Sequence, residues 1–152
     1  MEDQPQENVA DCVLKFLWQG SVKSLLDIEV MCSVDAIISI VKPKNLHSFR
    51  TTKPHLIIPV QDGDEELFEW FETAFNFLDE FRRSGRSVLV HCMAGHSRSS
   101  ALIIAYMMER LDFVSYEQAL AALRAMRPSV ILQPNYERRL QKLGTIVMGL
   151  KA

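Results

Sequence analysis

The clearest pattern in the chain is a stripe of apolar residues between residues 65 and 83 that repeats every three or four positions. This period puts the apolar side chains on one face of a helix, so it predicts a helix over 65–83. Glutamates stand near its start and Arg82 and Arg83 at its end, an order that suits the helix dipole, and Gly85 follows as a stop signal. The apolar stripe consists of Leu67, Trp70, Phe71, Ala74, Phe75, Leu78 and Phe81.

Four short apolar runs predict strands, at residues 13–18, 35–41, 55–60 and 87–91. The first run is closed by Gly20 and is expected at an edge of the sheet. The runs at 35–41 and 87–91 are nearly continuous in apolar residues, which is typical of strands buried on both faces.

Other segments predict helices. From Ser99 onward the chain is apolar almost all round as far as Met108, which indicates a central, buried helix. Ser115 with Gln118 three residues later forms a capping box, and the helix that it starts is expected to end near residues 127–128. A final helix is expected at 135–147, and residues 22–32 give a weak helical pattern.

Strands alternate with helices in the first two-thirds of the chain, and helices dominate the rest. This order predicts an α/β fold with a central, mostly parallel sheet of about five strands flanked by helices. We expect one domain over residues 9–152, since no linker or repeat interrupts it, preceded by a polar, flexible N-terminus at residues 1–8.

Composition narrows the class of protein. Hydrophobic residues make up 48% and charged residues 24% of the 152, which excludes a largely disordered chain. The net charge of −2 disfavours a general nucleic-acid-binding surface. No apolar run is long enough to cross a membrane, and the first residues lack the pattern of a signal peptide. Three widely spaced cysteines fit a reducing compartment, so a cytoplasmic location is expected, with the nucleus as a second one.

The segment with the most distinctive chemistry is the loop from His91 to Ser99, between a predicted strand and a predicted helix. The backbone N–H groups of residues 93–98 can turn inward and, next to a helix N-terminus, form an anion site. Gly95 allows the backbone to bend, and the guanidinium of Arg98 can hold two phosphate oxygens. Cys92 would lie at the bottom of this site, where thiols ionise readily and become nucleophiles.

The spacing of His91, Cys92, Gly95, Arg98 and Ser99 resembles the signature HCxxGxxR[ST] of the cysteine-dependent protein phosphatases. The flanking sequences Ala94-Gly95 and Ser97-Arg98-Ser99-Ser100 are similar to the dual-specificity branch, as is the stretch at 105–108. The resemblance spans roughly residues 13–143 and implies a protein-tyrosine-phosphatase-like fold of the small, atypical type.

The resemblance implies a role for each residue of the loop. Cys92 would attack phosphorus and form a phosphocysteine, which water then hydrolyses, without a metal or cofactor. Ser99 would stabilise the thiolate as it leaves, with a helix N-cap as the alternative, and His91 would tune the thiol, with a buried structural histidine as the alternative. The phosphate would be bound by Met93, Ala94, Gly95, His96, Ser97 and Arg98.

The family also uses an aspartic acid on a loop some thirty residues before the cysteine to protonate the leaving group. Asp62 lies 30 residues before Cys92 and is the expected acid, with Asp64 as the second choice. Both have a structural alternative: Asp62 with Glu65 fits a helix cap, and Asp64 a solvated charge in the first turn.

The expected partner is a phosphoprotein carrying phosphotyrosine, phosphoserine or phosphothreonine, and neither nucleic acid nor membrane is expected. The loop lacks the lysines that phosphatases of inositol lipids often carry there, and of Met93, Ala94 and His96 only His96 could add charge. The basic segment 42–53 could steer an anionic substrate, although a solvated loop is the favoured reading. Two alternatives stay open, namely a non-protein substrate such as a phosphoinositide or an RNA 5′ end, and a phosphate-binding module without turnover. The oligomeric state is left open.

The C-terminal part departs from the family pattern. The stretch from Arg127-Pro128 to Pro134-Asn135 is similar to the family's RPxIxPN motif but is two residues longer. Tyr136 follows, and the phenylalanine that is common after this motif is missing, so unusual packing of the last helix is expected. Arg127 itself is assigned to a solvated helix surface.

Overall fold

A five-stranded sheet forms the centre of the computed structural model, which describes residues 7–151. The strands are β1 (Ala10–Leu14), β2 (Leu17–Gly20), β3 (Ala36–Ser39), β4 (His55–Ile57) and β5 (Val88–His91). They lie in the order β1-β2-β5-β3-β4, and every pair is parallel except β1 with β2. The predicted α/β class and mostly parallel sheet are thus confirmed, and β5 is the central strand.

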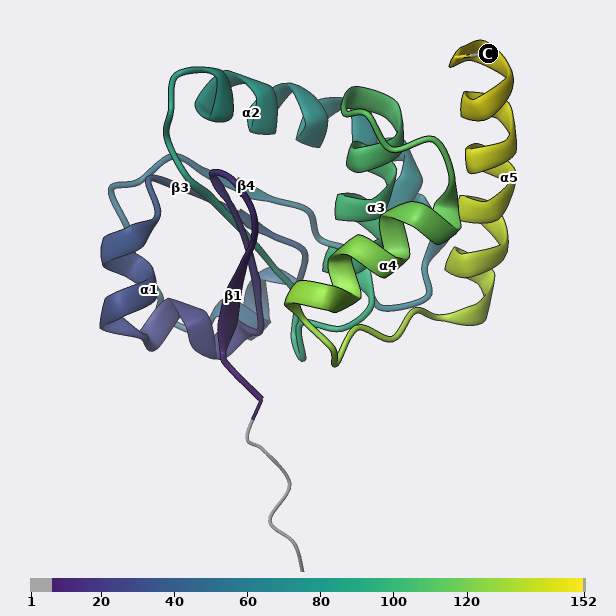
Figure 1. Ribbon diagram of the computed structural model, residues 1–152. Coiled ribbons are helices and arrows are strands. Elements are labelled where there is room, and N and C mark those ends of the chain that lie inside the picture. The colour runs from purple at the N-terminus through teal and green to yellow at the C-terminus, as the bar shows by residue number, and fades with distance from the viewer. Residues whose placement is uncertain (1–6, 152) are drawn as a thin grey trace, which may run out of the picture.

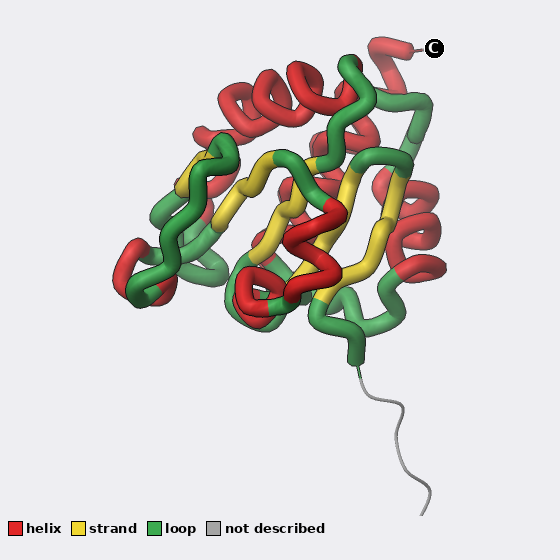
Figure 2. The backbone as a smooth tube through the Cα atoms, turned by 90° about the vertical axis from the view of Figure 1, so that its left-hand side faces the viewer, coloured by secondary structure: helices red, strands yellow, loops and turns green. Residues whose placement is uncertain are grey.

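Helices cover both faces of this sheet, with α1 (Ile28–Ser33) on one side and α2 (Phe71–Arg83), α3 (Arg98–Arg110), α4 (Tyr116–Met126) and α5 (Pro134–Lys151) on the other (Figure 1). Successive side chains along a strand point to opposite faces of the sheet, and this alternation divides them between the two helical layers. Ala36, Ile38, Val88 and Val90 pack against α2–α5, whereas Ile37 and Leu89 pack on the α1 side. Figure 2 shows the strands side by side behind short helical segments.

The first predicted strand is wrong in its limits, because residues 13–18 contain a turn. Lys15 and Phe16 join β1 to β2 in a hairpin, and Phe16 takes the positive φ of 64° that such turns normally give to glycine or asparagine. The run therefore carries no turn signal in its sequence. β1 is an edge strand, and β2 lies between β1 and β5.

Other elements agree with the predictions and differ at their ends. The expected helix at 22–32 is divided into η1 (Val22–Leu26) and α1, because Asp27 between them caps α1 through the N–H of Val30. The helix at 65–83 begins as a 3₁₀ segment, η3 (Glu65–Trp70), and the basic segment contains another, η2 (Pro43–Leu46). The last helix extends to Lys151, four residues beyond its expected end.

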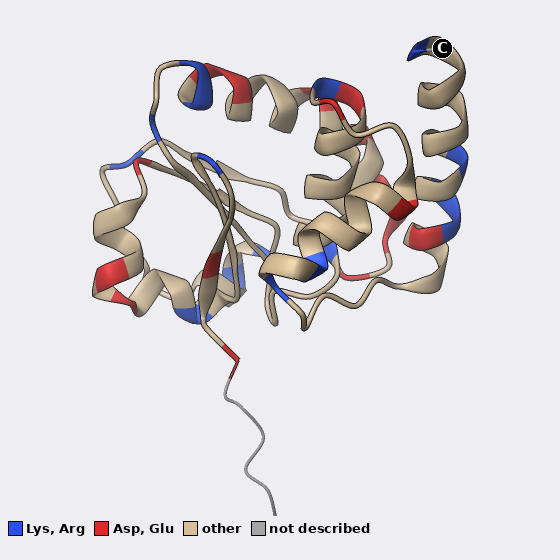
Figure 3. Cartoon of the chain, viewed as in Figure 1, with Lys and Arg blue, Asp and Glu red and all other residues tan. Residues whose placement is uncertain are grey.

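Basic and acidic segments are interspersed along the ribbon (Figure 3). Across residues 7–151 we find no helix with the length and apolarity needed to span a bilayer. The predicted flexible N-terminus at 1–8 falls largely outside the described residues, and the domain limits 9–152 stay a prediction. Glu7 and Asn8 are described and contact the candidate site, as shown next.

Candidate active site

The loop predicted to bind phosphate joins the carboxyl end of β5 to the first turn of α3. Ligands of α/β sheets bind at this edge, beyond the carboxyl ends of the strands. Gly95 has a φ of 78°, and a Cβ there would lie 2.6 Å from Nη2 of Arg127 and 2.7 Å from the carbonyl carbon of Gly20. The loop therefore needs glycine at this position for its conformation and for its close packing.

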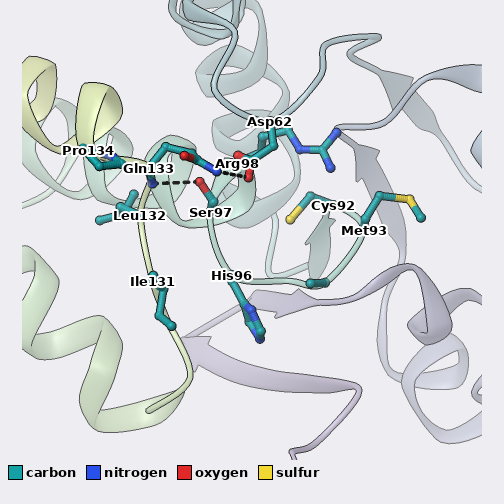
Figure 4. Close-up of a pocket in the computed structure, with 11 residues that line it drawn as sticks. Asp62, Cys92, Met93, His96, Ser97, Arg98, Ile131, Leu132, Gln133 and Pro134 are labelled. Atoms are coloured by element: carbon teal, nitrogen blue, oxygen red, sulfur yellow. Dashed lines mark hydrogen bonds between the residues drawn. The ribbon is translucent and has the colours of Figure 1, made fainter.

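Cys92 lies at the bottom of a cavity of about 520 Å³ and is only 2% exposed. Figure 4 shows its sulfur turned toward the middle of this cavity, with the side chains of Asp62 and Gln133 meeting at the edge. The Sγ atom lies 3.3 Å from Oγ of Ser99. A small anion entering the cavity would thus meet a buried thiol that has a hydroxyl beside it. The cavity is lined by Asp62, Cys92, Met93, Ala94, His96, Ser97, Arg98, Ile131, Leu132, Gln133 and Pro134.

Arg98 supplies the fixed positive charge of the site. It is 7% exposed, and its Nη1 donates to the carbonyl of Val60 at 2.8 Å, which ties the guanidinium to the segment before Asp62. The Nε–H is buried and has no hydrogen-bond partner among the described residues. An unpaired buried donor is costly, and a phosphate oxygen would satisfy it.

Ser99 is held by a network that the sequence did not indicate. Gln19 of β2 donates through Nε2 to Oγ of Ser99 at 3.0 Å and to Oγ of Ser100 at 2.7 Å. Ser100 in turn donates to the carbonyl of His96 at 2.6 Å. The N-cap of α3 is Ser97, so the alternative reading of Ser99 as that cap is wrong. Ser99 stands inside the first turn, with its hydroxyl toward the thiol.

His91 is fully buried below the loop. Its Nδ1 lies 3.0 Å from the carbonyl oxygen of Cys92, and its Nε2 lies 2.6 Å from Oγ of Ser39. Burial lowers the pKa of His91 to about 4, and the nearby charges of His55 and Arg98 act in the same direction. The ring is therefore neutral at pH 7 and can accept one hydrogen bond while donating another.

The two candidate acids are in different surroundings. Asp62 lines the cavity, and its Oδ2 accepts a hydrogen bond of 2.7 Å from Nε2 of Gln133. Asp64 caps η3 by accepting from the N–H of Glu66 at 2.9 Å. The cap that was considered for Asp62 is thus formed by Asp64.

Gln133 and its neighbours hold the segment that carries Asp62. The backbone N–H of Gln133 donates to Oγ of Ser97 at 3.2 Å, as the dashed line in Figure 4 shows. Asn135 donates to the carbonyl of Gly63, and the hydroxyl of Tyr136 to that of Asp64, both at 2.8 Å. Burial and the carboxylate of Asp62 raise the pKa of Tyr136 to about 12, so its hydroxyl keeps its proton.

Arg127 corrects another expectation, since it is 1% exposed and not a solvated side chain. Its Nε donates to the carbonyl of Gly95 at 3.0 Å, and its Nη2 to the carboxylate of Glu7 at 2.9 Å. The same carboxylate lies 2.8 Å from Nε2 of His96 and accepts from Oγ of Ser129 at 2.8 Å. Glu7, Arg127 and Ser129 thus form what we call the N-terminal clamp. It holds the loop from His91 to Ser99, which is the candidate catalytic loop.

The basic segment 42–53 does not act as one cluster. Nζ of Lys53 donates to the carbonyl of Val34 at 2.9 Å, at the end of the sheet opposite the catalytic loop. Lys42 and Lys44 follow β3 and belong to the end of the sheet that bears the loop.

Comparison with known proteins agrees with this geometry. Residues 17–145 match the family model described as "Dual specificity phosphatase, catalytic domain". Dual specificity protein phosphatase 22 of Xenopus tropicalis is 31% identical over 135 residues, which are 87% of this chain and 63% of that protein.

Solved structures give the same result. The crystal structure of DUSP15 has 28% identity and a TM-score of 0.81, covering 93% of this chain and 92% of that one. A complex of PTPMT1 with PI(5)P, at 18% identity, shares the fold with a TM-score of 0.76 and covers 95% and 100% of the two chains. By its fold, its signature loop and these matches, the chain belongs to the dual specificity phosphatase family.

Proposed function

We propose that the protein hydrolyses phosphotyrosine and phosphoserine or phosphothreonine in proteins through a phosphocysteine on Cys92, without a metal or cofactor. The observation that carries this proposal is the pairing of a buried thiol with the unpaired Nε–H of Arg98 at one cavity. Phosphate bound by Arg98 and the loop amides would hold phosphorus over the sulfur. The positive charge that other phosphatases obtain from metal ions would come from this guanidinium and the helix N-terminus.

In the first step, the Cys92 thiolate attacks phosphorus opposite the leaving oxygen. The S–P bond forms while the P–O bond breaks, and Asp62 transfers its proton to the departing alkoxide or phenolate. Arg98 and the N–H groups of residues 93–98 stabilise the charge on the three equatorial oxygens.

In the second step, water attacks the phosphorus of the phosphocysteine, and the carboxylate of Asp62 accepts a proton from it. The S–P bond breaks, and its electron pair returns to sulfur. The hydroxyl of Ser99, 3.3 Å from Sγ, can donate to the thiolate as it forms. Phosphate leaves, and the enzyme is regenerated. Met93, Ala94, Gly95, His96 and Ser97 shape the cradle.

A protein substrate is favoured over an inositol lipid by the charge around the cavity. The catalytic loop carries no lysine, and the charge that His96 could add is offset by the carboxylate of Glu7 at 2.8 Å. Opposite His96, the wall is made of Ile131, Leu132 and Pro134, which suit a side chain better than a ring bearing several phosphates. Three free thiols further support a reducing compartment, the cytoplasm or the nucleus.

The proposal is tested by hydrolysis of para-nitrophenyl phosphate in EDTA with wild type, Cys92→Ser, and the control Cys12→Ser. Cys12 is an exposed thiol on β1. We expect turnover in wild type and in Cys12→Ser, and background hydrolysis in Cys92→Ser, because serine at this position is a far weaker nucleophile. Folded, reduced wild type that binds phosphate without turnover would instead identify a binding module.

The substrate class is tested separately with phosphotyrosine and phosphothreonine peptides of one sequence and with phosphoinositide vesicles. We expect faster turnover of the peptides at equal phosphate concentration. Preference for the vesicles would retain the chemistry and overturn the protein substrate.

A further inference from the structure

Three side chains on neighbouring strands form a continuous hydrogen-bonded chain beneath the catalytic loop. Ser39 lies directly opposite His91 in the parallel register of β3 and β5. On β4, His55 lies opposite Ile37 of β3. Ile37 is two residues from Ser39, so His55 and Ser39 lie on the same face of the sheet. The Oγ atom of Ser39 is 2.6 Å from Nε2 of His91 and 2.6 Å from Nε2 of His55.

The hydrogen positions in this chain follow from counting donors and acceptors. Nδ1 of His91 faces the carbonyl oxygen of Cys92, which can only accept, so the proton of the neutral ring is on Nδ1. Nε2 of His91 must then accept, and the donor within reach is the hydroxyl of Ser39. Since that hydroxyl has one hydrogen, its oxygen accepts from Nε2–H of His55. The direction is His55 to Ser39 to His91 to Cys92.

The reverse direction of hydrogen bonding would create one repulsive contact. If Ser39 donated to His55, then Nε2 of His91 would have to be the donor to Ser39. Nδ1 would be left with a lone pair 3.0 Å from the carbonyl oxygen of Cys92, which is repulsive. The outcome thus depends on which nitrogen of His55 carries its proton.

We propose that His55 is a positioning residue, which acts through Ser39 to keep the proton of His91 on Nδ1 and so holds the carbonyl of Cys92. The kinetic part of this inference rests on the proposed function. His55 touches neither the cavity nor the thiol. It is partly exposed beside Phe49, whose ring centre is 6.0 Å away in an edge-on contact. Burial lowers the pKa of His55, so its ring is neutral at pH 7 and carries one proton, on either Nδ1 or Nε2.

The direct test is ¹⁵N NMR of the histidine rings without substrate, which distinguishes the two neutral tautomers. We expect His91 to carry its proton on Nδ1 in wild type and in His55→Gln, because the glutamine amide N–H can replace Nε2–H of His55. In His55→Phe, Ser39 loses the donor that fixes the direction of its hydroxyl, and in Ser39→Ala, Nε2 of His91 loses its donor, so we expect the Nε2–H tautomer of His91 to become detectable beside Nδ1–H in both variants. His47→Gln, an exposed histidine in the segment before β4, is the control and should leave His91 unchanged.

The kinetic test uses para-nitrophenyl phosphate. We expect kcat/KM of His55→Gln within about twofold of wild type and that of His55→Phe and Ser39→Ala lower by about tenfold, by analogy with the removal of a hydrogen-bond partner from a metal-binding histidine. Rescue by glutamine separates positioning from packing. Nε2–H in wild-type His91, or an unchanged tautomer and rate in both disruptive variants, would overturn the proposal. Full turnover in Cys92→Ser would overturn the proposed function and leave the tautomer result intact.

Discussion

Asp62 and Asp64 are two residues apart, but their carboxylates lie in different surroundings. The carboxylate of Asp64 caps η3, whereas that of Asp62 lies at the cavity, where Oδ2 accepts from Gln133 and Oδ1 accepts no hydrogen bond from the described residues. A group that must deliver a proton needs an oxygen within reach of the leaving group. Geometry thus favours Asp62 as the general acid.

This predicts opposite results for two alanine variants. Asp62→Ala should slow the hydrolysis of substrates with poor leaving groups by about a hundredfold, and much less that of aryl phosphates with good ones. Asp64→Ala should lower the free energy of unfolding by about 1 kcal/mol through loss of a cap and keep the leaving-group dependence of wild type. A series of substituted aryl phosphates with both variants checks this, and a steeper dependence in Asp64→Ala would reverse the assignment.

At the scale of elements, residues 61–64, which include the proposed acid Asp62, are hydrogen-bonded to the beginning of α5. Gln133, Asn135 and Tyr136 each contribute one hydrogen bond of 2.7–2.8 Å to it. Arg98 fixes the segment from the other side through Val60. The loop proposed to bind phosphate and the loop proposed to supply the proton are therefore parts of one hydrogen-bonded assembly.

Removing the hydroxyl of Tyr136 should make the position of the segment that carries Asp62 less well fixed. Tyr136→Phe keeps the buried ring and removes one of the two hydrogen bonds to the carbonyl of Asp64, which still accepts from the N–H of Leu67 at 3.3 Å, at a cost of about 1 kcal/mol in unfolding free energy. We expect kcat on poor leaving groups to fall severalfold, with KM close to wild type. Tyr116→Phe, another buried tyrosine, on α4, is the matched control and should keep its leaving-group dependence. Equal loss in both variants would indicate a general packing effect.

The sequence predicted features that are local and missed those that join distant segments. The signature loop could be read because its residues are contiguous, and the runs at 35–41 and 87–91 because buried parallel strands are nearly continuous in apolar residues. Gln19 reaches residues 80 and 81 positions away, and Arg127 reaches a residue 120 positions away, so neither pattern is visible in a window of sequence. The turn at Phe16 was missed because its conformation contradicts the usual turn residues.

For the whole molecule, His91 links stability to pH. Burial lowers its pKa to about 4, whereas in the unfolded chain it returns to about 6.5. Between these pH values the unfolded state binds more protons, so the free energy of unfolding falls as the pH decreases. The full contribution to stability is present above about pH 6.5, and the loss amounts to roughly 3 kcal/mol by pH 4.

Urea unfolding between pH 7 and pH 4 measures this slope. We expect His91→Asn to be less stable at pH 7 and to show a weaker loss of stability with acid, since it has no ring to protonate. His47→Gln should retain the wild-type slope because that histidine is exposed. An unchanged slope in His91→Asn would show that His91 is not the group responsible.

The N-terminal clamp has a consequence for the order in which the active site is completed during synthesis. A ribosome makes Glu7 before the signature loop, and Arg127 and Ser129 after it. Chains grow from the N-terminus, and contacts between distant residues wait for both partners. A nascent chain that ends after α3 would contain every residue of the signature and lack the guanidinium that holds Gly95. The loop from His91 to Ser99 would thus become rigid only after Arg127 has been synthesised.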